Sequence, residues 1–472
     1  MVVVNGFSKR KKKCIILCSF RKDLSQKTKQ KGYKTMKIRK VLSPSGLYKI
    51  VRSSFSKIVD HRQKGKVRIS LENILTSAFA MFSLKDPSLL FFDQRAGREK
   101  ENLKRVYGID EIACDTQMRT TLDPISPDAL DAAFKTIFDE AQRGKVLEQF
   151  EFIDGHYIMA MDGTSYFTSK KIHCSSCLTK VNSTTGEVTY HHQAVGTAIV
   201  HPNQKAVIPL APEPIIRQDG ESKNDCERNA SKRAYAKIRK AHPRLKLIIT
   251  QDALSPNAPN IQELGKHDFR YLLKVKESDH KFLFGKIAQA QEKGLVTEWT
   301  NTVGSSTYRF RFCNQLPLNA SNQDVKVNFL EFTELKKGKI VKRFTWVTDI
   351  SITRENAYQL VLAGRAHWKI ENETFNTLKN QGYQFEHNFG HGKKNLSVVL
   401  MKIMFLAFLV DQILQVACRL FQATWEKSKS KKKLWEHIRN LFYTLDFDSM
   451  EDIYRALLFG YQIDKVTIGY DT

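Results

Sequence analysis

The sequence lacks a hydrophobic run long enough to span a membrane. Its strongest uninterrupted apolar run, Ile403–Val410, lies between Lys402 and Asp411 and falls far short of the roughly 20 residues that a spanning helix needs. The amino terminus also lacks a charged region followed by an apolar one, which is the pattern of a secretory signal peptide. We therefore expect a cytoplasmic protein with no membrane partner.

Cysteine is scarce, with only 8 in 472 residues. Few, dispersed cysteines in a long chain indicate reduced intracellular thiols rather than a disulfide framework. The exception is the pair Cys174 and Cys177, which precedes His191 and His192. These four residues are candidates for a structural Zn²⁺ site. No second CxxC pair exists, and the alternative is two buried thiols beside a strand histidine.

The phosphate-binding motif GxxxxGKS/T is also missing, so ATP hydrolysis is not indicated. Acidic residues are too few to balance the basic ones: 49 Asp and Glu face 76 Lys and Arg, for a net charge of +27. Such an excess predicts a polyanionic partner, nucleic acid first and an anionic membrane second. Residues 1–70 hold 21 basic and 2 acidic residues, a net +19, which leaves +8 for the rest.

The length of 472 residues exceeds that of one ordinary domain. Hydrophobic residues make up 42%, which excludes wholesale disorder. Apolar residues at helical spacing predict a helical DNA-binding domain, or alternatively a helical cap on the next domain. The expected segments are a flexible basic arm (1–44, with Met36 as an alternative start), a helical DNA-binding domain (45–150), the first part of an α/β core (151–294), a β-rich insertion (295–350), a glutamate-bearing helix with core helices (351–424) and a C-terminal helical region (425–472).

Short apolar runs from Tyr157 onward predict strands. One run ends at Asp162-Gly163 and another, Leu245–Thr250, leads to Asp252. Strands that end in loops followed by helices predict a mixed α/β sheet. In 295–350 apolar and polar residues alternate, and Lys337-Gly338 separates two such runs, which predicts an antiparallel hairpin. Long helices are expected over 354–380 and 395–423.

Two aspartates occupy positions where α/β enzymes place reactive groups, at the carboxyl ends of buried strands. These are Asp162 and Asp252. Asp before Gly also commonly forms a turn, which is the alternative for Asp162. Asp219–Glu227 is interpreted differently, as the solvated start of a helix.

Glu371 is a third acidic candidate. At 100° per residue it shares a helix face with His367 and Phe375, whereas Glu373 lies nearer the polar face. A glutamate on an apolar face requires a cation, a metal or a proton. Asp162, Asp252 and Glu371 would form an all-oxygen ligand set, which suits Mg²⁺ or Mn²⁺. Two such ions activate a water or a 3′-hydroxyl in phosphoryl transfer, and the expected phosphodiester is DNA or RNA.

The segment Ala366–Glu371, followed by Phe375 and Leu378-Lys379, resembles the glutamate signature of DDE transposases of bacterial insertion sequences. The resemblance extends over about residues 65–420. It implies a ribonuclease-H-like mixed sheet with an antiparallel β insertion, preceded by a helical N-terminal domain. It also implies a magnesium-dependent triad of Asp162, Asp252 and Glu371 that cleaves transposon-end DNA and joins the 3′-hydroxyl to target DNA.

The same resemblance implies a homodimer that pairs two ends of a mobile element in a nucleoid-associated, bacterial or archaeal setting. The family's tyrosine and arginine before the glutamate are replaced here by Gly364 and His367, and its later lysine by Leu378. His367 and Lys379 remain candidate DNA contacts. Lys274 and Lys276, on the strand after the second aspartate, are further candidates, with plain surface charge as the alternative. The alternatives are a related metal-dependent nuclease without strand transfer and a DNA-binding protein with a decayed site.

Overall fold

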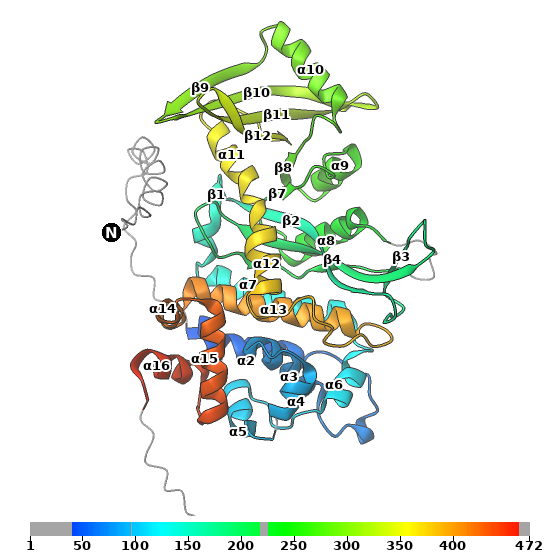
Figure 1. Cartoon of the computed structure of the whole chain (residues 1–472), viewed down its shortest axis with the longest axis vertical. Coiled ribbons are helices and arrows are strands. Elements are labelled where there is room, and N and C mark those ends of the chain that lie inside the picture. The colour runs from blue at the N-terminus through cyan, green and yellow to red at the C-terminus, as the bar shows by residue number, and fades with distance from the viewer. Residues whose placement is uncertain (1–39, 96, 218–224, 462–472) are drawn as a thin grey trace, which may run out of the picture.

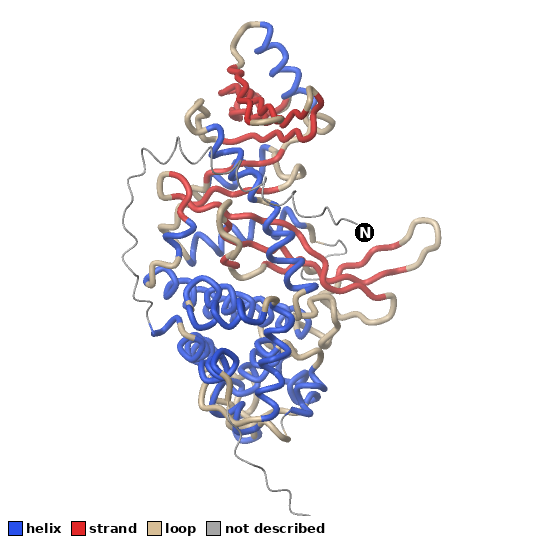
Figure 2. Tube along the Cα trace, turned by 60° about the vertical axis from the view of Figure 1, so that its left-hand side comes forward, coloured by secondary structure: helices blue, strands red, loops and turns tan. Residues whose placement is uncertain are grey.

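The computed structural model describes residues 40–95, 97–217 and 225–461 (Figure 1). Most of the predicted basic arm, residues 1–39, lies outside the described residues. The fold is mixed α/β: a large mixed sheet stands on a layer of helices (Figure 2).

Residues 40–150 form the first part of the helical layer. Its central helix, α3, begins after Ser70, whose hydroxyl accepts a hydrogen bond from the Asn73 N–H, and ends at Lys85 in a left-handed conformation. Such caps satisfy backbone groups that the helix leaves unpaired. The elements are η1 (Lys40–Leu42), α2 (Pro44–Phe55), η2 (Lys64–Lys66), α3 (Leu71–Leu84), α4 (Leu89–Arg95), α5 (Lys100–Asn102), η3 (Leu103–Tyr107), α6 (Asp115–Leu122), η4 (Pro127–Leu130), α7 (Asp131–Arg143) and η5 (Leu147–Phe150).

The last helices of the chain complete this layer. They are α13 (Leu396–Ala417), α14 (Arg419–Ser428), α15 (Lys431–Thr444) and α16 (Met450–Phe459). Glu451 of α16 accepts hydrogen bonds from the backbone and hydroxyl of Ser45 in α2. The amide of Asn102 donates to the carbonyls of Phe442 and Leu445. The predicted helical regions 45–150 and 425–472 therefore contact each other directly.

Helix α13 is long and apolar enough to cross a membrane by length and composition, although 94% of its most apolar window is buried inside the fold. The expected helix over 395–423 is instead interrupted at Cys418, which is extended. Both charged residues of α13 are paired with the N-terminal helices: Lys402 Nζ lies 2.6 Å from Asp131 Oδ1, and Asp411 Oδ2 lies 2.7 Å from Lys85 Nζ. The charges that interrupt the apolar sequence thus attach α13 to the layer around it.

One sheet contains the core strands and those of the predicted insertion. Its strand order is β3-β4-β2-β7-β8-β12-β11-β10-β9. The pairing of β12 with β8 joins the strands of the predicted insertion to those of the core. The hairpin at Lys337-Gly338 is confirmed, since Lys336 pairs with Lys339. The strands are β1 (Glu151–Ile153), β2 (His156–Ser169), β3 (Leu178–Val181), β4 (Val188–Val200), β5 (Ile208–Pro209), β6 (Glu213–Ile215), β7 (Leu247–Gln251), β8 (Arg270–Lys274), β9 (Thr297–Val303), β10 (Ser306–Asn319), β11 (Asn322–Lys336) and β12 (Lys339–Thr348).

Strand β2 runs through Asp162-Gly163 without turning. Asp162 pairs with Gly196 and Gly163 with Val195 on the antiparallel neighbour β4. The interpretation of Asp162-Gly163 as a strand end or a turn is therefore wrong. On its other side β2 pairs in parallel with β7, and that pairing ends at Ala160 and Thr250.

A broken helix crosses the sheet between the β9–β12 end and the helical layer (Figure 1). The helix predicted over 354–380 consists of α11 (Ala357–Ala366), a π-helical turn η6 (Ile370–Phe375) and α12 (Asn376–Asn380). Its π turn contacts β2 and β4. The remaining helices are α8 (Glu227–Ala241), α9 (Ala258–Lys266) and α10 (Lys281–Glu292).

Candidate functional site

The parallel pairing of β2 with β7 places two aspartates at one level of the sheet. Asp162 and Asp252 each lie two residues beyond the last pair, Ala160 and Thr250. Because side chains alternate between faces along a strand, Asp162 continues the face of that pair. Asp252 follows the end of β7, and its charge acts on both Asp162 and His367. The Thr250 hydroxyl lies 3.4 Å from His367 Nδ1. This is therefore the face that the broken helix crosses.

Close packing brings η6 onto this face. Opposite Asp162, a Cβ at Gly196 would lie 2.5 Å from Phe375 Cε1, so only glycine lets the ring sit on the strand. Phe375 closes the π-helical turn that carries Glu371 and Glu373. π-Helical turns recur at functional sites because they redirect side chains.

The π turn also overturns the reason for choosing Glu371. Glu371 is exposed and Glu373 is half-buried, the reverse of the face assignment made at 100° per residue, since a π turn has a wider period. Their electrostatic surroundings still differ. The charge of Glu371 acts on Asp162 and raises its pKa, whereas that of Glu373 acts on Lys369 and Lys431.

A fourth carboxylate, Glu227, approaches the aspartates from the other face of β2, because the side-chain directions of Asp162 and Gly163 alternate and Glu227 lies over Gly163. Its charge nevertheless acts on Asp162. It is the first residue of α8 and is partly buried, so the prediction of a solvated helix start is wrong for Glu227; residues 219–224 of that segment lie outside the described residues. Its Oε2 fills the space over Gly163, where a Cβ would lie 2.4 Å away. No sequence pattern separates this glutamate from the other acids near it, because its role depends on where α8 docks.

Negative charge accumulates at this site, offset in part by the Gly163 N–H, which donates a hydrogen bond to Asp162 Oδ1 at 2.9 Å and lowers the pKa of that carboxyl. Burial, followed by the charge of Glu227 and then those of Asp252 and Glu371, raises the pKa of Asp162 to about 7. Burial and Asp252 raise the pKa of Glu227. Within the described ranges, none of Asp162, Glu227, Asp252 and Glu371 forms an ion pair with a lysine or arginine. Carboxylate oxygens are the ligands that a hard divalent cation such as Mg²⁺ or Mn²⁺ prefers. Among the described residues, however, these carboxylates do not converge into a compact ligand group as the Cys/His residues described below do.

This repulsion predicts a stability effect of pH and metal. The Asp162 carboxyl has a folded-state pKa of about 7, above its unfolded value of about 3.9. Its contribution to stability is therefore present at low pH and lost as pH rises through about 7. In EDTA, the wild-type thermal midpoint should fall relative to that of Asp162→Asn between about pH 4 and 7. Mg²⁺ at pH 7 should raise the midpoint of wild type more than that of the variant; parallel responses would contradict the prediction.

The candidate DNA-contacting residues are placed differently from one another. Lys274 and Lys276 are exposed, and the charge of Lys274 acts on His367. Burial lowers the pKa of His367 to about 4, so this imidazole is neutral at pH 7 and is not a phosphate-binding cation there. Lys379 Nζ lies 2.8 Å from a Glu386 carboxylate oxygen and is already paired.

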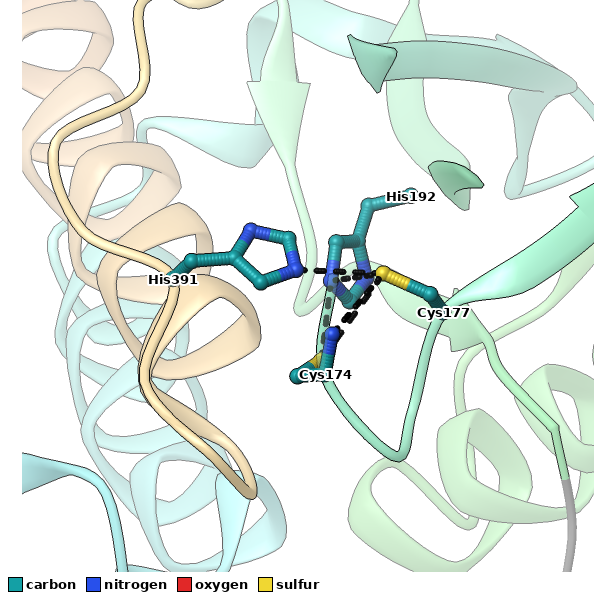
Figure 3. A group of neighbouring side chains, drawn as sticks. All are labelled: Cys174, Cys177, His192 and His391. Atoms are coloured by element: carbon teal, nitrogen blue, oxygen red, sulfur yellow. Dashed lines mark hydrogen bonds between the residues drawn. The ribbon is translucent and has the colours of Figure 1, made fainter. Parts of the chain in front are cut away.

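Three of the four predicted Cys/His ligands come together, and His391 takes the place of His191. Cys174, Cys177 and His192 meet His391, from the loop before α13 (Figure 3). His191 is not part of the group, because its ring nitrogens face the hydroxyls of Thr168 and Thr189. The adjacent histidines of β4 point to opposite faces, which explains the correction.

Comparisons with known proteins add little. Neither a family model nor a curated protein matches this sequence. Among solved structures, the chain is similar to the piggyBac transposase in its synaptic complex with hairpin DNA, with a TM-score of 0.35 and 11% identity, covering 91% of this chain and 83% of that chain. A similarity this weak carries no argument about function.

Proposed function

We propose that this chain is a DDE-type transposase of an insertion sequence. Asp162, Asp252 and Glu371 would bind two Mg²⁺ or Mn²⁺ ions, with which transposon-end DNA is hydrolysed and the freed 3′-hydroxyl joined to target DNA. The observation that carries the proposal is the register of β2 with β7, which sets both aspartates at one level of the sheet, beside the Glu371 helix.

The arrangement of the sheet supports a ribonuclease-H-like core. Parallel strands β2 and β7 lie at the centre with β4 antiparallel beside them, and β9–β12 follow Asp252 and precede Glu371 in the chain. This is the order of core, β-rich insertion and glutamate helix that the resemblance implies. The ions would supply charge stabilisation to both oxygens of the displacement. The carboxylates would hold them, and no covalent enzyme intermediate is required.

DNA affinity would come from other parts of the chain. Helix α3 has 13 of its 14 residues buried and is not available as a recognition helix, which favours a supporting role for part of the 45–150 region. The exposed Lys274 and Lys276 lie at the end of β8 and would contact the phosphate backbone near the acids. The basic segment 1–39 would add sequence-independent affinity that falls with salt. A homodimer acting in the nucleoid is part of the same proposal.

The proposal is tested with the DNA that flanks the gene. A duplex carrying the inverted repeats at its ends is incubated with the protein and Mg²⁺, Mn²⁺ or EDTA, together with a supercoiled target plasmid. We expect metal-dependent cleavage at the repeat end and joined products in the plasmid. Cleavage without joining would identify a nuclease, and binding without cleavage would identify a decayed protein.

Glu227→Gln is expected to lower the rate of end cleavage by about 10- to 100-fold, the usual effect of losing a group that supports metal ligands. The carboxylate over Gly163 adds negative charge to the site, and the amide would not. Glu263→Gln, on α9, is the matched control because Glu263 pairs with Lys266 and His267. If Glu227→Gln cleaves end DNA as fast as Glu263→Gln does, Glu227 has a purely structural role.

A further inference from the structure

A second site lies away from the acidic residues, where three distant segments meet. Cys174 and Cys177 flank a turn between β2 and β3, His192 belongs to β4, and His391 lies between α12 and α13 (Figure 3). Cys177, His192 and His391 are 2%, 0% and 7% exposed. His192 is four residues along β4 from Gly196, the partner of Asp162, which is about 13 Å at the rise of a strand. The two sites are therefore separate.

The four ligand atoms have the spacing of a tetrahedron. Zinc bonds of about 2.3 Å to sulfur and 2.0 Å to nitrogen place the corners about 3.8 Å apart for two sulfurs and about 3.6 Å apart for sulfur and nitrogen. Here Cys174 Sγ and Cys177 Sγ are 3.9 Å apart. Three sulfur-to-Nε2 contacts measure 3.4 Å from Cys174 to His192, 3.5 Å from Cys177 to His192 and 3.1 Å from Cys177 to His391, and all four ligand atoms lie within 4.8 Å of one another.

We propose that Cys174, Cys177, His192 and His391 bind one structural Zn²⁺ ion. Two cysteines and two histidines form a complete tetrahedral set that leaves no position open for substrate, and two thiolates neutralise the charge of the ion in a buried place. Both histidines direct Nε2 at the sulfurs, while each Nδ1 is buried and has no hydrogen-bond partner among the described residues. A disulfide would need the sulfurs at about 2.05 Å, far closer than they lie.

The surrounding hydrogen bonds show what the ion would hold together. Ser175 and Ser176, between the two cysteines, donate from their hydroxyls to the carbonyls of Lys393 and Lys394 at 3.0 Å. On the other side of this loop, the Asp123 carboxylate accepts from the backbone N–H groups of 393–396. The zinc site would thus attach the loop between the Glu371 helix and α13 to the sheet. The hydrogen bonds of Asp123 attach the same loop to the end of α6.

The first test is the metal content of the purified full-length chain after dialysis against metal-free buffer, measured by mass spectrometry. We expect about one zinc per chain. His192→Ala should lose it and the neighbouring His191→Ala should keep it. Cys174→Ser should also lose the metal, with the exposed Cys114→Ser as its control. Because Cys174 is partly exposed, its serine variant also serves if His192→Ala fails to fold.

The second test reads the structural role. Stripping zinc with a strong chelator should lower the thermal midpoint and speed tryptic cleavage at Lys393 and Lys394, and added Zn²⁺ should reverse both changes. Folded wild-type protein without zinc, whether its thiols are free or oxidised, would overturn the proposal. So would zinc that is lost in His191→Ala and retained in His192→Ala. These outcomes are independent of transposase activity, since none of them is measured on DNA.

Discussion

Asp252→Asn is expected to abolish Mg²⁺-dependent cleavage of transposon-end DNA, by at least about 10³-fold, the equivalent of about 4 kcal/mol of transition-state stabilisation. Asp252 lies just after β7, level with Asp162 on β2. Asparagine keeps the shape of the side chain but removes the charge that binds the cation. Cleavage of a labelled repeat-end duplex, followed over time, measures the loss.

Asp162→Asn and Glu371→Gln should have losses of the same order. End binding, measured by gel shift in EDTA, should remain within a few-fold of wild type because the proposed DNA contacts are made by other residues, which these substitutions leave unchanged. Glu373→Gln is the matched control for Glu371→Gln, since its charge acts on Lys369 and Lys431 rather than on Asp162. If Glu373→Gln is inactive and Glu371→Gln cleaves, the assignment of the glutamate is wrong.

Asp411→Ala is expected to destabilise the fold by about 3–5 kcal/mol, the range for removing one partner of a buried ion pair. Lys85 and Asp411 are 0% and 8% exposed with 2.7 Å between Nζ and Oδ2. Asp411 also accepts a hydrogen bond from the Tyr383 hydroxyl. Its loss leaves a buried ammonium group at the junction of α3 and α13. The midpoint of thermal unfolding, followed by circular dichroism, measures the effect.

The control for this prediction is an exposed aspartate, Asp448, in the C-terminal helical region. Asp448→Ala removes a pair with Arg105 in which the carboxylate is 84% exposed, and exposed pairs contribute about 0–1 kcal/mol. The double variant Lys85→Met/Asp411→Leu should recover most of the lost stability, because no unpaired charge remains. A single Asp411→Ala variant as stable as Asp448→Ala would show that Lys85 adapts by losing its proton or reaching water.

Local features of the fold were predictable from the sequence where local chemistry decides them. The hairpin at Lys337-Gly338 and the alternation of apolar and polar residues in β10 and β11 are short-range patterns. Predictions from local patterns were wrong where contacts between distant segments determine the conformation. Asp162-Gly163 was expected to end a strand, yet β4 pairs along both residues and keeps the chain extended.

The helix that carries Glu371 shows the same limit. A wheel drawn at 100° per residue assumes an unbroken α-helix, whereas packing of Phe375 against Gly196 accompanies a π turn that exposes Glu371. The zinc ligands are a further case. A CxxC pair is visible in the sequence, but the choice between His191 and His192 depends on strand register, and His391 follows Cys177 by 214 residues.

By itself, the sequence determined the classes of element, the candidate acids and the concentration of basic charge near the amino terminus, because composition, periodicity and turn chemistry are local properties. The tertiary structure decided which residues meet. It aligned Asp162 with Asp252 through parallel pairing, added Glu227 through the docking of α8, and replaced His191 with His391. The physical reason is that these contacts join segments far apart in the chain, and only the packing of sheet and helices sets their relative positions.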